Sequence, residues 1–136
     1  MREAPDSSVL IPALAQWHPK HLQARAALAD VNVVIAHVLV ETFSVLTRLP
    51  APHRVSPADA AAAVTGLPWK AIALEPEAHG RLVADAGRFG IAGGAVYDAL
   101  IAATAKRHGV TVLTRDQRSR RTYERLGADY RLIRDQ

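Results

Sequence analysis

The sequence predicts an α/β protein with a three-layer α/β/α arrangement and a mostly parallel central sheet of about five strands. Short apolar runs rich in β-branched residues alternate with longer helical segments along the chain, as in sheets whose strands are joined by helices. The chain has 136 residues, the size of one domain, and we expect a single domain over residues 1–136. No internal repeat or polar linker divides the sequence.

The first half of the chain predicts a short strand, four helices and two further strands. Pro50 and Pro52 end one helix, because proline cannot continue the backbone hydrogen bonds. Ser56 is a suitable N-cap before Pro57 at the first position of the next helix. In order, we expect a strand within residues 2–5, helices at 9–15 and 21–29, a strand at 31–36, helices at 37–49 and 57–65, and a strand at 70–74.

The second half predicts three helices and two strands. Gly109 and Gly127 mark the ends of two helices, because glycine readily adopts the left-handed conformation found after a last helical turn. In order, we expect helices at 76–87 and 95–108, a strand at 110–114, a helix at 118–126 and a strand at 130–133. Sites in such folds form outside the carboxyl ends of the strands.

Composition excludes several classes of function. The absence of cysteine excludes a disulfide scaffold, a thiolate metal site and a cysteine nucleophile. No apolar run reaches the roughly 18 residues of a membrane span, and no apolar signal region follows the first residues, so a cytoplasmic location is expected. The net charge of +4 and the sequence pI of about 10.0 favour an acidic or polyanionic partner. An arginine-rich composition also arises in GC-rich genomes, so the charge alone favours nucleic acid only slightly.

Four carboxylates occupy unusual places. Glu41 is the only carboxylate in residues 31–47, and Asp98 is the only charged residue in residues 91–105. Asp6 and Asp116 each follow an expected strand. Each acid also has a simpler explanation: Asp6, Asp116 and Asp98 are possible helix caps, and Glu41 is a possible half-exposed helix residue.

If the four acids converge, their mutual repulsion requires a counter-ion or raised pKa values. Two unit charges about 4 Å apart repel by roughly 4 kcal/mol at an effective dielectric constant near 20. Oxygen ligands select a hard cation, Mg²⁺ or Mn²⁺. Such an ion activates water and stabilises charge on a phosphoryl oxygen, so the cluster indicates metal-dependent phosphodiester hydrolysis.

Four segments carry a resemblance to a known family: DSSVLI (6–11), LVETFSVLTR (39–48), YDALIAATA (97–105) and VLTRD (112–116). Together they resemble the PIN-domain ribonucleases of the VapC type, the toxin half of type II toxin–antitoxin pairs. The opening residues 2–5 depart from the apolar first strand of that family. The resemblance implies a doubly wound sheet, a Mg²⁺- or Mn²⁺-dependent endoribonuclease, a homodimer, and a cognate VapB-like antitoxin that blocks the site.

Carried over by motif, Asp6, Glu41, Asp98 and Asp116 are the expected catalytic acids. Asp6 and Asp98 are the first candidates for metal ligands, and Glu41 and Asp116 are possible further ones. Hydrogen bonds from two neighbouring hydroxyl groups are expected to orient these acids. The two hydroxyl groups belong to Ser7 and Thr114.

Cations and aromatic residues are candidates for RNA contact. The cations follow the last acid; three of them, at positions 118, 121 and 125, share a helical face, whose simpler role is a solvated surface. Trp17 and Trp69 are possible base-stacking residues, although packing is the favoured explanation for both. The RNA-contact candidates among the cations are Arg115, Arg118, Arg121 and Arg125.

Two other functions stay open at this point. One is a non-catalytic RNA-binding or protein-interaction module on the same fold, because fold alone does not determine function. The other is a nuclease that processes RNA without acting as a toxin. RNA binding that is indifferent to Mg²⁺ would favour the first, and an adjacent reading frame for a DNA-binding antitoxin would favour the toxin.

Overall fold

The computed structural model describes residues 2–134, so Met1 and residues 135–136 of the expected domain lie outside the described residues. Its strands pair only in parallel, which confirms the expected fold class. Five strands carry these pairings: β1 (Glu3–Pro5) pairs with β4 (Thr111–Thr114), β4 pairs with β5 (Tyr130–Leu132), and β2 (Val33–Ile35) pairs with β3 (Lys70–Ile72).

The backbone hydrogen bonds divide these strands into a three-stranded and a two-stranded group, which meet where β1 contacts β2. The Asp6 amide donates to the Leu113 carbonyl, and the Thr111 amide donates to the Arg2 carbonyl. Residues 2 and 6 therefore face β4. The backbone N–H and C=O groups of successive residues in a strand point alternately to its two edges. The backbone groups of Pro5 therefore face β2 and not β4. Proline has no N–H to donate there, which removes one of the hydrogen bonds that would pair β1 with β2.

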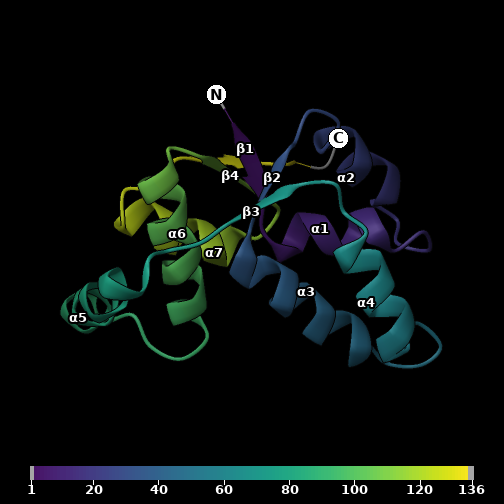
Figure 1. Ribbon diagram of the computed structural model, residues 1–136, viewed down its shortest axis with the longest axis horizontal. Coiled ribbons are helices and arrows are strands. Elements are labelled where there is room, and N and C mark those ends of the chain that lie inside the picture. The colour runs from purple at the N-terminus through teal and green to yellow at the C-terminus, as the bar shows by residue number, and fades with distance from the viewer. Residues whose placement is uncertain (1, 135–136) are drawn as a thin grey trace.

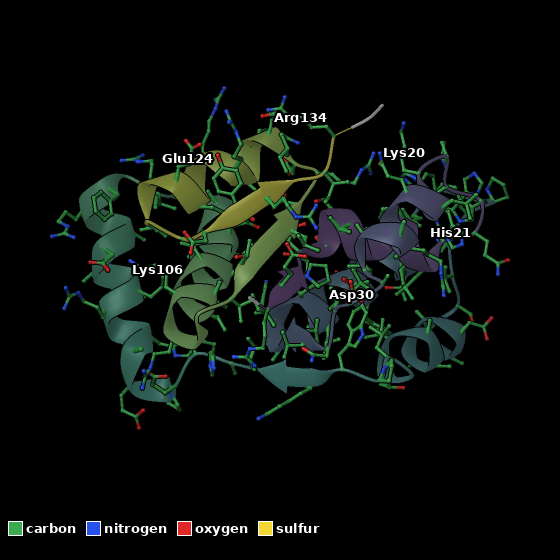
Figure 2. All side chains as sticks on the ribbon, turned by 90° about the horizontal axis from the view of Figure 1, so that it is seen from above. Lys20, His21, Asp30, Lys106, Glu124 and Arg134 are labelled. Atoms are coloured by element: carbon green, nitrogen blue, oxygen red, sulfur yellow. The ribbon has the colours of Figure 1, made fainter. Side chains whose placement is uncertain are left out.

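Residues 2–134 form seven α-helices, which surround the strands. Figure 1 shows α6 and α7 on one side of the strands and α1, α2 and α4 on the other, with α5 beyond α6. Figure 2 gives the view from above, in which Lys20 and His21 lie at the opposite end of the molecule from Lys106. The helices are α1 (Ser7–Leu14), α2 (His21–Ala27), α3 (Ala36–Thr47), α4 (Pro57–Thr65), α5 (His79–Phe89), α6 (Ala95–His108) and α7 (Gln117–Arg125), with a 3₁₀ turn, η1, at Pro76–Ala78.

Local sequence explains where several helices begin and end. The Ser56 hydroxyl accepts a hydrogen bond from the Asp59 amide at 3.2 Å and caps α4, as expected. Gly109 follows α6 with a φ of 63°. The helix expected at 76–87 differs from the prediction: it opens as the 3₁₀ turn and continues to Phe89, where Gly90 ends it with a φ of 67°.

The core lies around β2 and β4, the strands on either side of β1. Every residue of β2 and β4 is buried, as expected for parallel strands covered on both faces. The carboxyl ends of β1, β2 and β4 lead directly into α1, α3 and α7. Residues at these three junctions therefore gather at one edge of the strands. None of the helices described between residues 2 and 134 combines the length and apolar character needed to cross a bilayer.

Candidate active site

Asp6 lies at the junction between β1 and α1 and is only 3% exposed. Its Oδ1 accepts hydrogen bonds from the Ser8 amide at 3.0 Å and the Ser8 hydroxyl at 2.6 Å. Its Oδ2 accepts a hydrogen bond from the Tyr123 hydroxyl at 2.7 Å. Burial raises the pKa of Asp6, although bonds from Ser8, Thr114 and Tyr123 oppose that rise. The carboxylate both caps α1 and is held in a fixed position.

Glu41 extends from α3 toward the start of α1. Its Oε1 accepts a hydrogen bond from the Ser7 hydroxyl at 2.5 Å. Its Oε2 lies 3.4 Å from His37 Nε2, and the Glu41 side chain is 27% exposed. The predicted contact between Ser7 and one of the acids is therefore present, and it joins two helices that follow different strands.

Asp98 lies in the first turn of α6 and is half-buried. It does not cap the helix, because Gly94 occupies the N-cap position. Burial raises the pKa of Asp98 to about 6, a hydrogen bond from Ser119 opposes the rise, and the charges of Asp6, Glu41 and Asp116 add to it. The other three acids that the sequence singled out thus lie within electrostatic range of Asp98.

Asp116 caps α7 and lies beside Asp98. Its Oδ1 accepts a hydrogen bond from the Arg118 amide at 2.8 Å, and its Oδ2 accepts one from the Ser119 hydroxyl at 3.2 Å. Since Ser119 contacts both Asp116 and Asp98, it connects these two acids. The capping explanation for Asp6 and Asp116 is confirmed, and each cap also faces the cluster.

Hydroxyl groups beneath the acids fix the local backbone. The Ser8 hydroxyl lies 3.3 Å from the Thr114 hydroxyl and accepts a hydrogen bond from the Arg115 amide at 2.7 Å. The Thr114 hydroxyl accepts one from the Asp116 amide at 3.1 Å. These bonds join the start of α1 to the end of β4.

Three residues of this network were missed by sequence reasoning: Ser8, Ser119 and Tyr123. Ser119 and Tyr123 are buried members of the otherwise strongly charged helix α7. Their spacing of four residues among arginines was the available signal, because uncharged residues at that spacing form the buried face of an amphipathic helix. Ser8 gave no comparable signal.

The cations proposed for RNA contact lie mainly on the exposed side of α7. Arg118, Arg121 and Arg125 are exposed, and Arg115 is half-buried. The Arg125 guanidinium lies 5.7 Å from the centre of the Phe89 ring. Arg118 Nε lies 4.0 Å from Asp116 Oδ1 at the start of α7, whereas Arg125 lies in the last turn of that helix.

The four carboxylates are chemically suited to a hard cation, but their side chains are not positioned around one ion. Carboxylate oxygens are the ligands that Mg²⁺ and Mn²⁺ prefer, and half-buried Asp98 is crowded by three other acids. Within residues 2–134, however, no group of three or more histidine or acidic side chains is arranged to hold a metal ion. The acids meet at electrostatic range, and side-chain movement would be needed to bring them to one ion.

A parallel α/β fold with acids at the carboxyl edge of its strands is shared with a known family. Residues 4–125 match the family model of the PIN domain. The chain therefore belongs to the PIN-domain family, which confirms the family expected from the sequence.

Within that family, the chain is a homologue of the VapC ribonucleases, which confirms the expected enzyme class. It is 43% identical over 131 residues to Ribonuclease VapC40 of Mycobacterium tuberculosis, covering 96% of this chain and 98% of that protein. It is 41% identical over 125 residues to Ribonuclease VapC27 of Mycobacterium tuberculosis, covering 91% of both.

Solved structures share the fold at lower identity. VapC20 of Mycobacterium tuberculosis, described as a sarcin-ricin loop cleaving toxin, has a TM-score of 0.68 and 17% identity, covering 87% of this chain and 92% of that chain. The DNA-bound VapBC of Salmonella typhimurium has a TM-score of 0.67 and 21% identity, covering 98% of this chain and 100% of that chain.

Proposed function

We propose that this chain is a Mg²⁺- or Mn²⁺-dependent endoribonuclease toxin that hydrolyses RNA phosphodiester bonds. The observation that carries the proposal is the meeting of Asp6, Glu41, Asp98 and Asp116 from four separate parts of the chain. Such crowding of like charges is unfavourable without a counter-ion. The identity of 41–43% to two VapC ribonucleases supports the same conclusion.

In this proposal Asp6 and Asp98 hold the ion, with Glu41 and Asp116 as further ligands or as acceptors for its water. A divalent ion at such a site supplies Lewis-acid activation of water and stabilisation of charge on the phosphoryl oxygen. The Tyr123 and Ser8 hydroxyls fix the orientation of Asp6, and Ser7 fixes that of Glu41. These bonds orient Asp6 and Glu41 in advance, and the acids of residues 2–134 would still have to move closer together to hold one ion.

The basic surface supplies contacts to the RNA backbone in this proposal. Arg115, Arg118, Arg121 and Arg125 follow the last acid along the chain. Contacts to phosphates position a nucleic acid without reading its sequence. The arginines would therefore hold the strand near the acids, and the choice of cleavage site would depend on other contacts.

We further propose that a VapB-like antitoxin restrains the enzyme and that the chain acts as a homodimer in the cytoplasm. A structural neighbour of the same fold is described as a DNA-bound VapBC from Salmonella typhimurium. Coexpression with the product of an adjacent short reading frame tests this partner. Growth arrest by the chain alone and relief by coexpression are expected; arrest that coexpression leaves unchanged would contradict the choice of partner.

The ribonuclease proposal is tested by incubating purified protein with RNA, with and without Mg²⁺ or Mn²⁺, and mapping the cleaved ends. Asp98→Asn is expected to abolish cleavage while the fold persists, and Asp30→Asn is the matched control. Asp30 is exposed and lies in the loop between α2 and β2 (Figure 2). Full activity of purified Asp98→Asn would contradict the site assignment.

A second candidate function is a non-catalytic RNA-binding module. It is favoured by the lack of a preformed metal-binding group among residues 2–134. This candidate predicts RNA binding that does not respond to Mg²⁺ and is unchanged by Asp98→Asn, together with no cleavage by the wild type.

A further inference from the structure

An aromatic pair borders the acid cluster. His37 and Tyr97 are stacked with their ring centroids 5.2 Å apart and their planes 7° from parallel. They come from the first turns of α3 and α6, the two helices that carry Glu41 and Asp98. Tyr97 directly precedes Asp98, and His37 Nε2 lies 3.4 Å from Glu41 Oε2. Each ring of the pair therefore lies next to a candidate catalytic acid: His37 beside Glu41, and Tyr97 beside Asp98 in the chain.

Packing does not account for Tyr97. Its residue surface is 54% exposed even though His37 covers one face of its ring. It belongs to none of the three apolar clusters formed by the described residues. Tyr123, by contrast, is fully buried and donates a hydrogen bond to Asp6. Tyr97 thus presents a flat apolar surface to solvent beside a charged site.

We propose that the outer face of Tyr97, supported by His37, is a stacking site for an RNA base next to the scissile phosphate. This inference rests on the proposed ribonuclease function and adds a substrate contact to the same site. A base stacked on an aromatic side chain strengthens single-strand binding by about 5- to 150-fold. Every base has a π-face, so the site would accept all four bases with modest preferences.

The position of the ring favours a base over other ligands. The acids repel a phosphate that lacks a counter-ion, whereas an uncharged base can lie against Tyr97 without that cost. His37 restrains the plane of the tyrosine ring, so less conformational freedom is lost when the base binds. The arginines of α7 would hold the backbone while Tyr97 orients one nucleoside.

The alternative is that the stack only joins α3 to α6. A purely structural role predicts that loss of Tyr97 lowers the melting temperature without any effect that depends on the base. Substitution by phenylalanine keeps the stacking surface, and substitution by leucine removes the aromatic face. Comparison of Tyr97→Leu with Tyr97→Phe therefore separates the two roles.

Trp17, which the sequence left open between base stacking and packing, packs in the structure against His53 and lines a cavity apart from the acid cluster, and it therefore serves as a matched control. It is 44% exposed and stacks on His53 at a centroid distance of 4.0 Å. It lines a different cavity, of about 300 Å³, together with Leu46 and Val55. Trp17→Leu therefore removes a comparable aromatic–histidine stack that has no contact with the four acids.

The test measures binding of short oligouridylates that carry one 2-aminopurine at successive positions, in the cleavage-deficient Asp98→Asn background. We expect fluorescence quenching at one position, retained by Tyr97→Phe and Trp17→Leu and lost in Tyr97→Leu. We also expect Tyr97→Leu to weaken binding by about 5- to 150-fold. An abasic nucleotide at the quenched position should remove the difference between Tyr97→Leu and its parent.

Two outcomes would overturn the stacking site while leaving the ribonuclease proposal intact. One is equal binding and quenching by Tyr97→Leu and its parent; the other is a loss that persists with the abasic RNA. In either case the wild type would still cleave RNA in the presence of Mg²⁺ or Mn²⁺. A wild type that neither binds nor cleaves RNA would instead overturn both the stacking site and the proposed function.

Discussion

Replacing Asp98 by asparagine should stabilise the metal-free protein at neutral and alkaline pH. Burial and three neighbouring acids raise the pKa of Asp98 to about 6. The folded state therefore disfavours the ionised carboxylate, and an uncharged amide of similar shape removes that penalty. The amide oxygen is still an acceptor that faces Ser119, so we expect little change in the local geometry.

The size of the effect follows from the change in pKa. The ordinary value for this carboxyl group is 3.8, and the folded value is about 6. Because one pKa unit corresponds to about 1.36 kcal/mol, ionisation of Asp98 lowers the free energy of unfolding by up to about 3 kcal/mol. This is an upper bound, since Asp98 is only half-buried and solvent screens its charge.

The sign of the pH dependence follows from proton binding. Between about pH 4 and pH 6 the folded state holds more protons at Asp98 than the unfolded state does, so stability falls as pH rises. The loss is complete above about pH 6 and absent below about pH 4. Asp98→Asn should therefore exceed the wild type in stability at about pH 8, and the difference should vanish near pH 4.

Denaturant unfolding in the presence of a metal chelator measures this difference, with exposed Asp30→Asn as the control for a lost charge. We expect Asp30→Asn to change the free energy of unfolding by less than about 0.5 kcal/mol at either pH. Equal stability of Asp98→Asn and wild type at about pH 8, or a difference that does not change with pH, would refute the reasoning.

Three further predictions concern the metal, the buried network and the basic helix. At a Mg²⁺ concentration about 100 times its dissociation constant, wild type should gain roughly 2.7 kcal/mol in stability and Asp98→Asn much less; no shift in the wild-type melting temperature would count against an ion site. Tyr123→Phe leaves buried Asp6 without one hydrogen-bond donor and should lower the free energy of unfolding by about 1–3 kcal/mol, measured with denaturant; unchanged stability would contradict the importance of this bond. Arg118→Gln and Arg121→Gln should each reduce the slope of log affinity for single-stranded RNA against log salt by about 0.7. Arg48→Gln on the end of α3 should leave that slope unchanged, and equal slopes for all variants would exclude these phosphate contacts.

Local sequence predicted most of the fold because its helices and strands are short and are bounded by proline and glycine residues. The runs around Val33–Ile35 and Thr111–Thr114 became fully buried strands, as continuous β-branched stretches indicate. Gly109 ended α6 at the predicted residue. The division of the sheet between β1 and β2 was not predicted from the sequence. It depends on which strand lies beside the edge of β1 where Pro5 lacks an N–H, and the pairing of β1 with β4 leaves that edge to β2.

Some residues of the candidate site were likewise predictable from the sequence, and others were not. Glu41 and Asp98 were conspicuous because each is an isolated acid in an apolar stretch. Tyr123 was not, because a tyrosine in an arginine-rich helix is ordinary until the helix packs with that ring against Asp6, 117 positions away in the sequence. The stack of His37 on Tyr97 was missed for the same reason, since its members lie on helices that only the fold brings together.

The sequence by itself predicted the α/β class and the family and singled out the four candidate acids, because these inferences depend on residue types and on spacing along the chain. Only the tertiary structure decided which hydroxyl groups contact Asp6 and Glu41, and that three other acids raise the pKa of Asp98; within residues 2–134 it brings no three acidic or histidine side chains into an arrangement that holds one ion. The physical reason is distance: charge repulsion, desolvation and hydrogen bonding act through space over a few ångströms. Contacts between residues far apart in the chain are formed only when the helices pack around the strands.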